Sequence, residues 1–146
     1  MPYPPMMVQP MREELTRLGF QELTTAEEVD RAVAEASEPM LLVVNSICGC
    51  AAGVARPGVA LSLSSPAAPG RLATVFAGQD LEATARARSY FTGFPASSPQ
   101  VAILAKGKLL FMLQRHEIEG RTAEQVAAAL AAAYQRLSSP PPTPAA

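Results

Sequence analysis

The residues best suited to chemistry in this chain are its two cysteines, Cys48 and Cys50, which a single glycine separates. They follow the apolar run at residues 41–44, which is typical of a strand buried on both faces. An alanine-rich segment that favours a helix comes next. A thiol in the first turn of a helix faces unpaired N–H groups and the positive end of the helix dipole, and both stabilise the nucleophilic thiolate. The spacing therefore predicts a reactive thiol pair at a strand–helix junction.

Two other uses of the cysteine pair are open. Free cysteine is often buried as a small apolar side chain. A metal site is the second alternative, but Cys48 and Cys50 supply only two ligands, and the single histidine, His116, cannot complete a four-ligand structural site within one chain. A metal site shared between two copies of the chain is still an alternative, and such a site would require a dimer.

Length and composition limit the classes of function. The chain has 146 residues, 49% of them hydrophobic, which suits one domain with a full core. No apolar run approaches the ~20 residues of a membrane-spanning helix, and residues 1–8 lack the pattern of a signal peptide. A net charge of −1 and the absence of Trp give no sign of the basic or aromatic surface that binds nucleic acid or an anionic membrane. We therefore expect a cytoplasmic protein, in which two cysteines favour catalysis or metal binding over a structural disulfide.

The elements around the cysteines follow from apolar periodicity and helix signals. Residues 1–10, with four prolines, are expected to be an irregular lead-in, followed by a short helix at 11–18. A capping-box pattern that starts at Thr24 opens a helix, and the strand at 40–44 comes after it. The helix after the cysteines is expected to run from about 49 to 63, kinked by Pro57.

The second half of the chain is expected to begin with a strand at 72–76 and a helix capped by Asp80. Two apolar runs then flank Gly107-Lys108, which suits a type II′ hairpin turn. This turn sets Pro99 opposite His116, so His116 becomes a candidate for substrate binding or proton transfer.

The C-terminal part is predicted to be a helix and a tail. A capping box at Thr122 and Gln125 starts the final helix. Residues 138–146 hold four prolines and are expected to be disordered. The predicted organisation is one domain over residues 1–137, followed by this tail.

The order of the elements predicts the fold class. Strands separated by helices imply parallel pairing with right-handed crossovers, and a closing hairpin adds antiparallel strands. We therefore expect an α/β protein of thioredoxin-like fold. It has a central mixed sheet flanked by helices, a closing β-hairpin and a C-terminal helix. In this fold the redox cysteines lie at the end of the first core strand, where Cys48 and Cys50 are placed.

Several motifs resemble the bacilliredoxin family. They are spread over residues 3–137 and comprise residues 3–7, 45–53, 55–57, 97–99 and 115–120. The family is bacterial and thioredoxin-like, and it removes bacillithiol, a low-molecular-weight thiol, from mixed disulfides on protein cysteines. The resemblance implies that Cys48 is the attacking thiol, that Cys50 is the resolving thiol, and that Pro99 is the cis-proline facing the active site.

The resemblance implies a thiol–disulfide oxidoreductase that acts on bacillithiolated client proteins, with bacillithiol as co-substrate and no other cofactor. Cys48 and Cys50 are the expected catalytic residues, while Gly49, Pro99 and His116 are expected to support substrate binding. The alternatives are a protein disulfide isomerase or reductase and a two-cysteine metal-binding protein.

Two arginines within these motifs are expected to be solvated surface charges. They are Arg56 and Arg115, and either one could meet an anionic thiol co-substrate.

Overall fold

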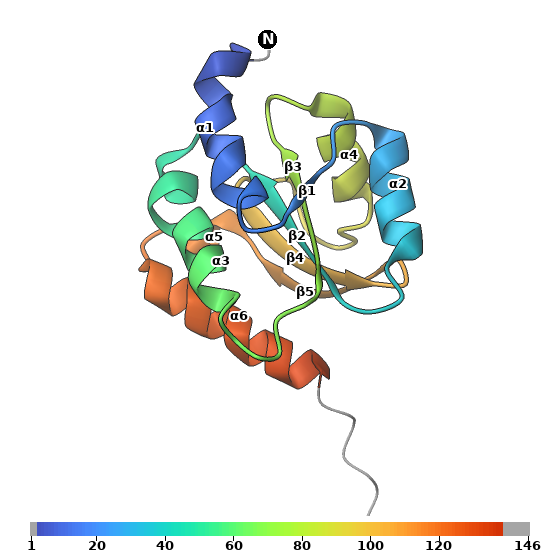
Figure 1. Ribbon diagram of the computed structural model, residues 1–146, viewed down its shortest axis with the longest axis vertical. Coiled ribbons are helices and arrows are strands. Elements are labelled where there is room, and N and C mark those ends of the chain that lie inside the picture. The colour runs from blue at the N-terminus through green and yellow to red at the C-terminus, as the bar shows by residue number, and fades with distance from the viewer. Residues whose placement is uncertain (1–2, 139–146) are drawn as a thin grey trace, which may run out of the picture.

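The structure is a computed structural model, and it describes residues 3–138. Its elements are α1 (Pro5–Thr16), β1 (Gln21–Glu22), α2 (Ala26–Glu35), β2 (Met40–Asn45), η1 (Ala51–Ala55), α3 (Arg56–Ser62), β3 (Arg71–Phe76), α4 (Leu81–Ser89), β4 (Gln100–Ala105), β5 (Lys108–Leu113), α5 (Arg115–Ile118) and α6 (Ala123–Ser138). A five-stranded sheet in the order β1-β3-β2-β4-β5 lies between two layers of helices. Figure 1 shows α1, α3 and α6 on one face of this sheet and α2 and α4 on the other.

Strand β2 is the centre of the sheet. It pairs in parallel with β3 and antiparallel with β4, so the sheet is mixed, as predicted. All six of its residues are buried. Met40, Leu42 and Val44 pack into the core under α2 and α4, whereas Leu41 and Val43 pack into the core under α3 and α6. Alternate side chains thus fill both cores, which is why an unbroken apolar run is needed here.

Helix α1 begins earlier than predicted, so the expected irregular lead-in over residues 1–10 is wrong from Pro5 onward. Pro5 takes the first helical position, where a missing N–H removes no helical hydrogen bond. Pro10 lies inside the helix and cannot donate to the carbonyl of Met6. Because Met6 is exposed, water can bind this carbonyl instead.

The helical segment after the cysteines covers residues 49–62, within one residue of the prediction. Its middle part, η1, is a π-helix, in which the Arg56 N–H donates to the Ala51 carbonyl five residues back. Pro57 has no N–H for the Gly53 carbonyl, and its ring would clash with that carbonyl in a regular α-helix. The irregularity predicted as a kink therefore takes the form of a π-helical turn.

Two helix caps differ in detail from the prediction. Thr25, not Thr24, is the N-cap of α2, and Glu28 completes the capping box. Asp80 is the N-cap residue of α4, as predicted, but its side chain makes no capping hydrogen bond, because its carboxylate binds Arg12 through hydrogen bonds of 2.7 and 3.1 Å. A two-point ion pair is a stronger interaction than a single cap, and this one ties α1 to the start of α4.

The turn between β4 and β5 lies one residue before the predicted turn. Lys106 and Gly107 form the connection with φ values of 53° and 76°, and positive φ at both positions is the requirement of a type I′ turn. Ala105 therefore pairs with Lys108, and a bulge further along the hairpin shifts the register again.

This register makes the predicted position of His116 wrong. Strand β5 ends at Leu113, and His116 lies in the short helix α5 instead of opposite Pro99 on a strand. His116 is exposed there, and no hydrogen bond or ion pair of its side chain occurs within residues 3–138.

Helix α6 continues through Ser138, the residue at which the tail was predicted to begin. Residues 139–146 lie outside the described part of the chain, and so does the prediction that they are disordered. The division into a domain over 1–137 and a tail stays a prediction.

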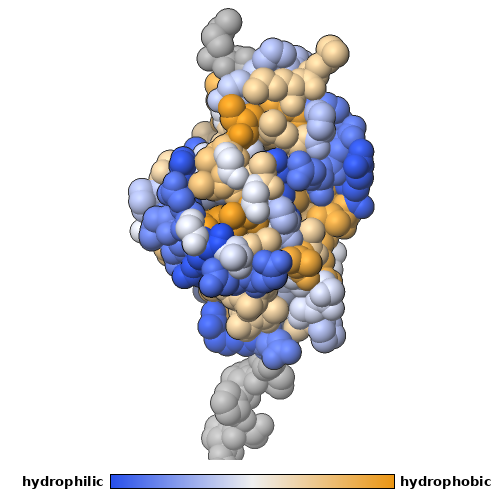
Figure 2. Space-filling model, turned by 90° about the vertical axis from the view of Figure 1, so that its left-hand side faces the viewer, coloured by the Kyte–Doolittle hydropathy of each residue, from blue (hydrophilic) through white to orange (hydrophobic). Residues whose placement is uncertain are grey.

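The outer surface carries scattered apolar side chains. Over the face formed by α1, α3 and α6, Figure 2 shows apolar and polar residues interleaved, without one unbroken apolar area. Isolated apolar side chains are ordinary on protein surfaces. Within the described range, every helix is too short or too polar to span a membrane.

Gly58 allows α3 to pack closely against α6. A Cβ at this position would lie 2.8 Å from Val126 Cγ1 and 3.1 Å from the carbonyl oxygen of Ala123. We expect Gly58→Ala to lower the free energy of unfolding by about 1–2 kcal/mol, because α6 has to shift. The matched control is Gly53→Ala in η1, where nothing lies within 4 Å of the new Cβ. Urea denaturation followed by circular dichroism compares the two, and equal loss of stability in both would contradict the close packing.

Candidate active site

Cys48 lies just beyond the end of β2, and Gly49 and Cys50 begin the helical segment that follows. The Cys48 carbonyl accepts hydrogen bonds from the N–H groups of Ala51 and Ala52, at 3.0 and 3.1 Å. Cys48 is therefore the residue that caps the first helical turn. This is the strand–helix junction that the sequence predicts.

The sulfur of Cys48 accepts a hydrogen bond of 3.3 Å from the backbone N–H of Cys50. This bond is the main reason why the pKa of the Cys48 thiol is lowered, because it favours the thiolate. Partial burial works against the shift, while a hydrogen bond from the Cys50 side chain and the positive charge of Arg115 add to it. Cys48 is thus the thiol that this environment activates.

Cys50 experiences the opposite effect. Its pKa is raised, first by burial and then by the hydrogen bond with Cys48 and the charge of that residue. Both cysteines are free and half-buried, so residue exposure does not separate them. The two thiols differ instead in the hydrogen bonds and charges around them.

The backbone of Cys48 is held by side chains from the end of β2. The Cys48 N–H donates to Ser46 Oγ at 3.0 Å, and the Ser46 N–H donates to Asn45 Oδ1 at 2.9 Å. Asn45 is itself fixed, because its Nδ2 donates to the carbonyl of Met11 in α1 at 3.1 Å. These bonds explain why polar residues interrupt the apolar run just before the cysteines.

Arg56 is the last member of this hydrogen-bond network. Its Nη1 donates to Asn45 Oδ1 at 2.8 Å and to the Ser46 carbonyl at 2.9 Å. Its Nε lies 3.2 Å from Glu14 Oε1 in α1, which makes an ion pair, although the angle is too poor for a hydrogen bond. The side chain is only 3% exposed, so the expectation that Arg56 is a solvated surface charge is wrong.

A cavity of about 310 Å³ opens beside Cys48. It is lined by Tyr3, Ser46, Ile47, Cys48, Ala77, Gly78, Arg88 and Ser98. Gly78 has a φ of +79°, and a Cβ there would lie 3.2 Å from the ring of Tyr3. Glycine therefore lets the Tyr3 ring lie over the turn after β3 and form one wall of the cavity.

Of the residues predicted to support substrate binding, Pro99 follows a residue that lines the cavity, whereas His116 has no described contact with the cysteines. The Ser98–Pro99 peptide bond is cis, as the resemblance implies, and Ser98 lines the same cavity as Cys48. Arg115 acts electrostatically on both thiols from the first turn of α5. His116 is its neighbour, but no described contact joins its side chain to either cysteine.

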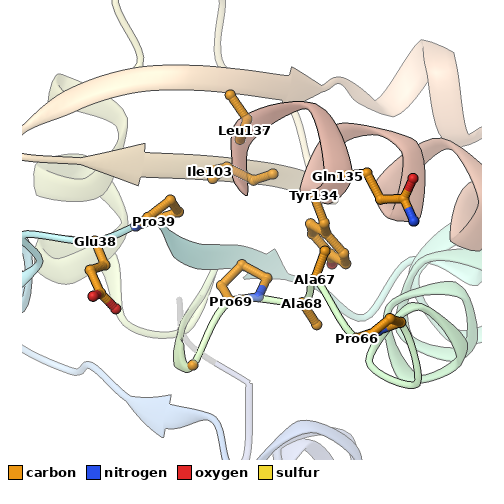
Figure 3. A pocket seen from close by; sticks show the side chains of 11 residues that line it. Glu38, Pro39, Pro66, Ala67, Ala68, Pro69, Ile103, Tyr134, Gln135 and Leu137 are labelled. Carbon is orange, nitrogen blue, oxygen red and sulfur yellow. The ribbon is translucent and has the colours of Figure 1, made fainter. Parts of the chain in front are cut away.

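A larger hollow of about 700 Å³ lies at the opposite end of β2. Figure 3 shows Pro39, which precedes β2, on one side of it and Tyr134 and Leu137 of α6 on another. Neither cysteine lines this hollow. Within residues 3–138, no group of three or more His, Cys, Asp or Glu side chains is arranged to hold a metal ion.

Tyr3 and Arg88 are residues of the cavity beside Cys48 to which sequence reasoning assigned no role. Tyr3 stands in a motif of the family resemblance, which was the available signal, but its position did not indicate a role. Arg88 gave no signal, because it lies 40 positions from Cys48 within an ordinary helical pattern. Only the packing of α4 against the end of β3 brings it to the cysteine.

Comparison with known proteins agrees with this geometry. A family model described as "Disulphide isomerase" matches residues 3–138. A bacilliredoxin of Koribacter versatilis is 52% identical over 134 residues, which cover 92% of each chain. A bacilliredoxin of Bacillus cereus is 50% identical over 129 residues, covering 88% of this chain and 89% of the relative.

The fold is similar to that of a solved thioredoxin, Mala s 13 of Malassezia sympodialis. The TM-score is 0.56 at 13% identity, over 82% of this chain and 91% of that one. This likeness confirms the predicted thioredoxin-like fold. Together with the sequence relatives it shows that the chain belongs to the bacilliredoxin family and is a thiol–disulfide oxidoreductase.

Proposed function

We propose that the chain removes bacillithiol from mixed disulfides on client protein cysteines, through the Cys48-Gly49-Cys50 site. The Cys48 thiolate attacks the bacillithiol sulfur of the mixed disulfide, and the bond from that sulfur to the client breaks. The client cysteine leaves as a thiolate and takes up a proton, while bacillithiol stays bound to Cys48. The disulfide thus passes from the client to the enzyme: the client cysteine is reduced and Cys48 is oxidised, and a reducing thiol has to return the site to its starting state before the next turnover.

The hydrogen bond from the Cys50 N–H to Cys48 Sγ carries this proposal. It lowers the pKa of Cys48 and so raises the thiolate fraction near neutral pH, which thiol exchange needs. The raised pKa of Cys50 keeps the second thiol protonated until the first has reacted. Cys50 then attacks Cys48, releases bacillithiol and leaves a Cys48–Cys50 disulfide, unless a second small thiol resolves the adduct instead.

The identity of the small thiol comes from the relatives named bacilliredoxin. Clients that carry bacillithiol are the proposed partners, and the cytoplasm is the proposed compartment. Gly49 is exposed between the two cysteines and gives their turn its freedom, and Ser98, which precedes Pro99, lines the cavity. For His116, substrate binding or proton transfer at the outer edge of the site stays a proposal.

A protein disulfide isomerase is the second candidate, and the description of the matching family model favours it. An isomerase exchanges disulfides between cysteines of its client, so it needs no small thiol. The two activities are therefore separated by offering the same client with bacillithiol bound or with a scrambled internal disulfide.

The lowered pKa of Cys48 predicts alkylation at unusually low pH. In the Cys50→Ala variant, where the backbone donor at residue 50 is retained, we expect a midpoint below the ordinary thiol value of about 8.5. Arg115→Gln should move this midpoint upward, because a positive charge near the thiolate is lost, whereas the exposed Arg121→Gln should leave it unchanged. Iodoacetamide rates across pH provide the measurement. A midpoint at or above the ordinary value would contradict the activation of Cys48.

The division of labour predicts opposite behaviour of two cysteine variants. Cys50→Ala should accumulate bacillithiol on Cys48, because the resolving thiol is missing. Cys48→Ala should lose removal of bacillithiol, because burial still raises the pKa of Cys50 in this variant and the cavity opens beside residue 48. Intact-mass spectrometry after incubation with a bacillithiolated client reads both variants. An adduct on Cys48→Ala and none on Cys50→Ala would reverse the roles, and no adduct on either would overturn the proposed function.

A further inference from the structure

We propose that the cavity beside Cys48 holds the small-thiol half of the mixed disulfide and that Arg88 binds a carboxylate of this thiol. The inference rests on the proposed exchange at Cys48 and adds the chemical class of thiol that the site selects.

Arg88 is a half-buried arginine without an acidic partner in residues 3–138. The other arginines in this range that are buried or half-buried each lie within 3.2 Å of a carboxylate oxygen: Arg12, Arg56 and Arg71. Partial burial lowers the pKa of Arg88, which reflects the cost of holding its charge away from water. The one arginine left with this uncompensated cost is the one that shares a cavity with Cys48.

The guanidinium of Arg88 is held in position but not saturated. Its Nη2 donates to the Ser97 carbonyl at 2.7 Å, and its Nε donates to Gln100 Oε1 at 3.3 Å. Gln100 is fully buried and also donates to the Pro95 carbonyl, so the support is rigid. A guanidinium carries five N–H donors, and these two bonds leave donors for a ligand.

The size of the cavity favours a small molecule over a client loop. About 310 Å³ is at the lower end of the volumes that ligand pockets have. The ring of Tyr3 closes one side, and Ser46 and Ser98 also line the cavity. A compact, polar thiol with a negative charge matches these walls.

Occupation of the cavity by the small thiol also sets the direction of the exchange. With its carboxylate at Arg88, the sulfur of this thiol is the one presented to Cys48, and the client sulfur faces solvent. Cys48 then forms its new bond to the small thiol, and the client cysteine is the leaving thiolate. The same contact therefore selects the thiol and determines which half of the mixed disulfide is released.

Two mixed disulfides of one model client test the contact. One carries N-acetylcysteine and the other N-acetylcysteine amide, which share the thiol and differ in the carboxylate. We expect the native chain to release the client from the acid at least about tenfold faster than from the amide, since a hydrogen-bonded charge pair contributes this much. A bacillithiolated client, measured in parallel, should behave like the acid.

Arg88→Gln should abolish the preference for the carboxylate. Release of the client from the N-acetylcysteine disulfide should slow to the rate measured with the N-acetylcysteine amide disulfide, and the latter rate should change little. The matched control is Arg86→Gln, two residues earlier on α4 and exposed, where the preference should remain. The rate with the amide reports whether each variant is folded. If Arg88→Gln slowed the reactions of both probes equally, Arg88 would serve to support the segment around Ser97 or to bind the client protein. Either result would overturn the inference.

The two proposals fail in different ways. Exchange at equal rates with both probes in the native chain would overturn the role of Arg88 and leave the exchange at Cys48 intact. Absence of exchange with the acid, the amide and bacillithiol would overturn the proposed function and this inference with it.

Discussion

A buried guanidinium beneath the cysteines is the contact on which the site depends. Arg56 follows the cysteines in the chain, but its side chain reaches back to Asn45 and Ser46 at the end of β2. Removing a charge from water costs several kcal/mol unless partners satisfy it. Glu14 from α1 provides the opposite charge. Because Ser46 also binds the Cys48 N–H, the same group joins α1, β2 and α3 and fixes the backbone of Cys48.

This fixed backbone makes two neighbouring thiols chemically different. The turn directs the Cys50 N–H at the sulfur of Cys48, which lowers the pKa of Cys48, whereas burial and the nearby sulfur raise the pKa of Cys50. The cavity opens on the side of Cys48, and Arg88 lies in its wall. Activation of one thiol and space for a small partner therefore occur at the same residue, and this coincidence favours exchange with a low-molecular-weight thiol over exchange between protein disulfides.

The elements that place Cys48 were predictable because their signals are local. The apolar run of β2, the glycine between the cysteines and the alanine-rich helix each act within a few residues, and the cis bond before Pro99 followed from the family resemblance. The position of His116 was not predictable, because a type I′ turn and a bulge changed the register by single residues. Arg56 and Arg88 were missed for another reason. Their roles depend on side-chain contacts between separate elements, which no local pattern records.

The most direct test is a crystal structure of the Cys50→Ala variant trapped with bacillithiol. We expect a disulfide from Cys48 Sγ to the bacillithiol sulfur, with the bacillithiol group inside the cavity between Tyr3 and Arg88 and a carboxylate against the guanidinium. The backbone N–H at residue 50 should still point to Cys48 Sγ. A bacillithiol group that extends into solvent, or a Cys48 that does not form the adduct, would contradict the site described for this chain.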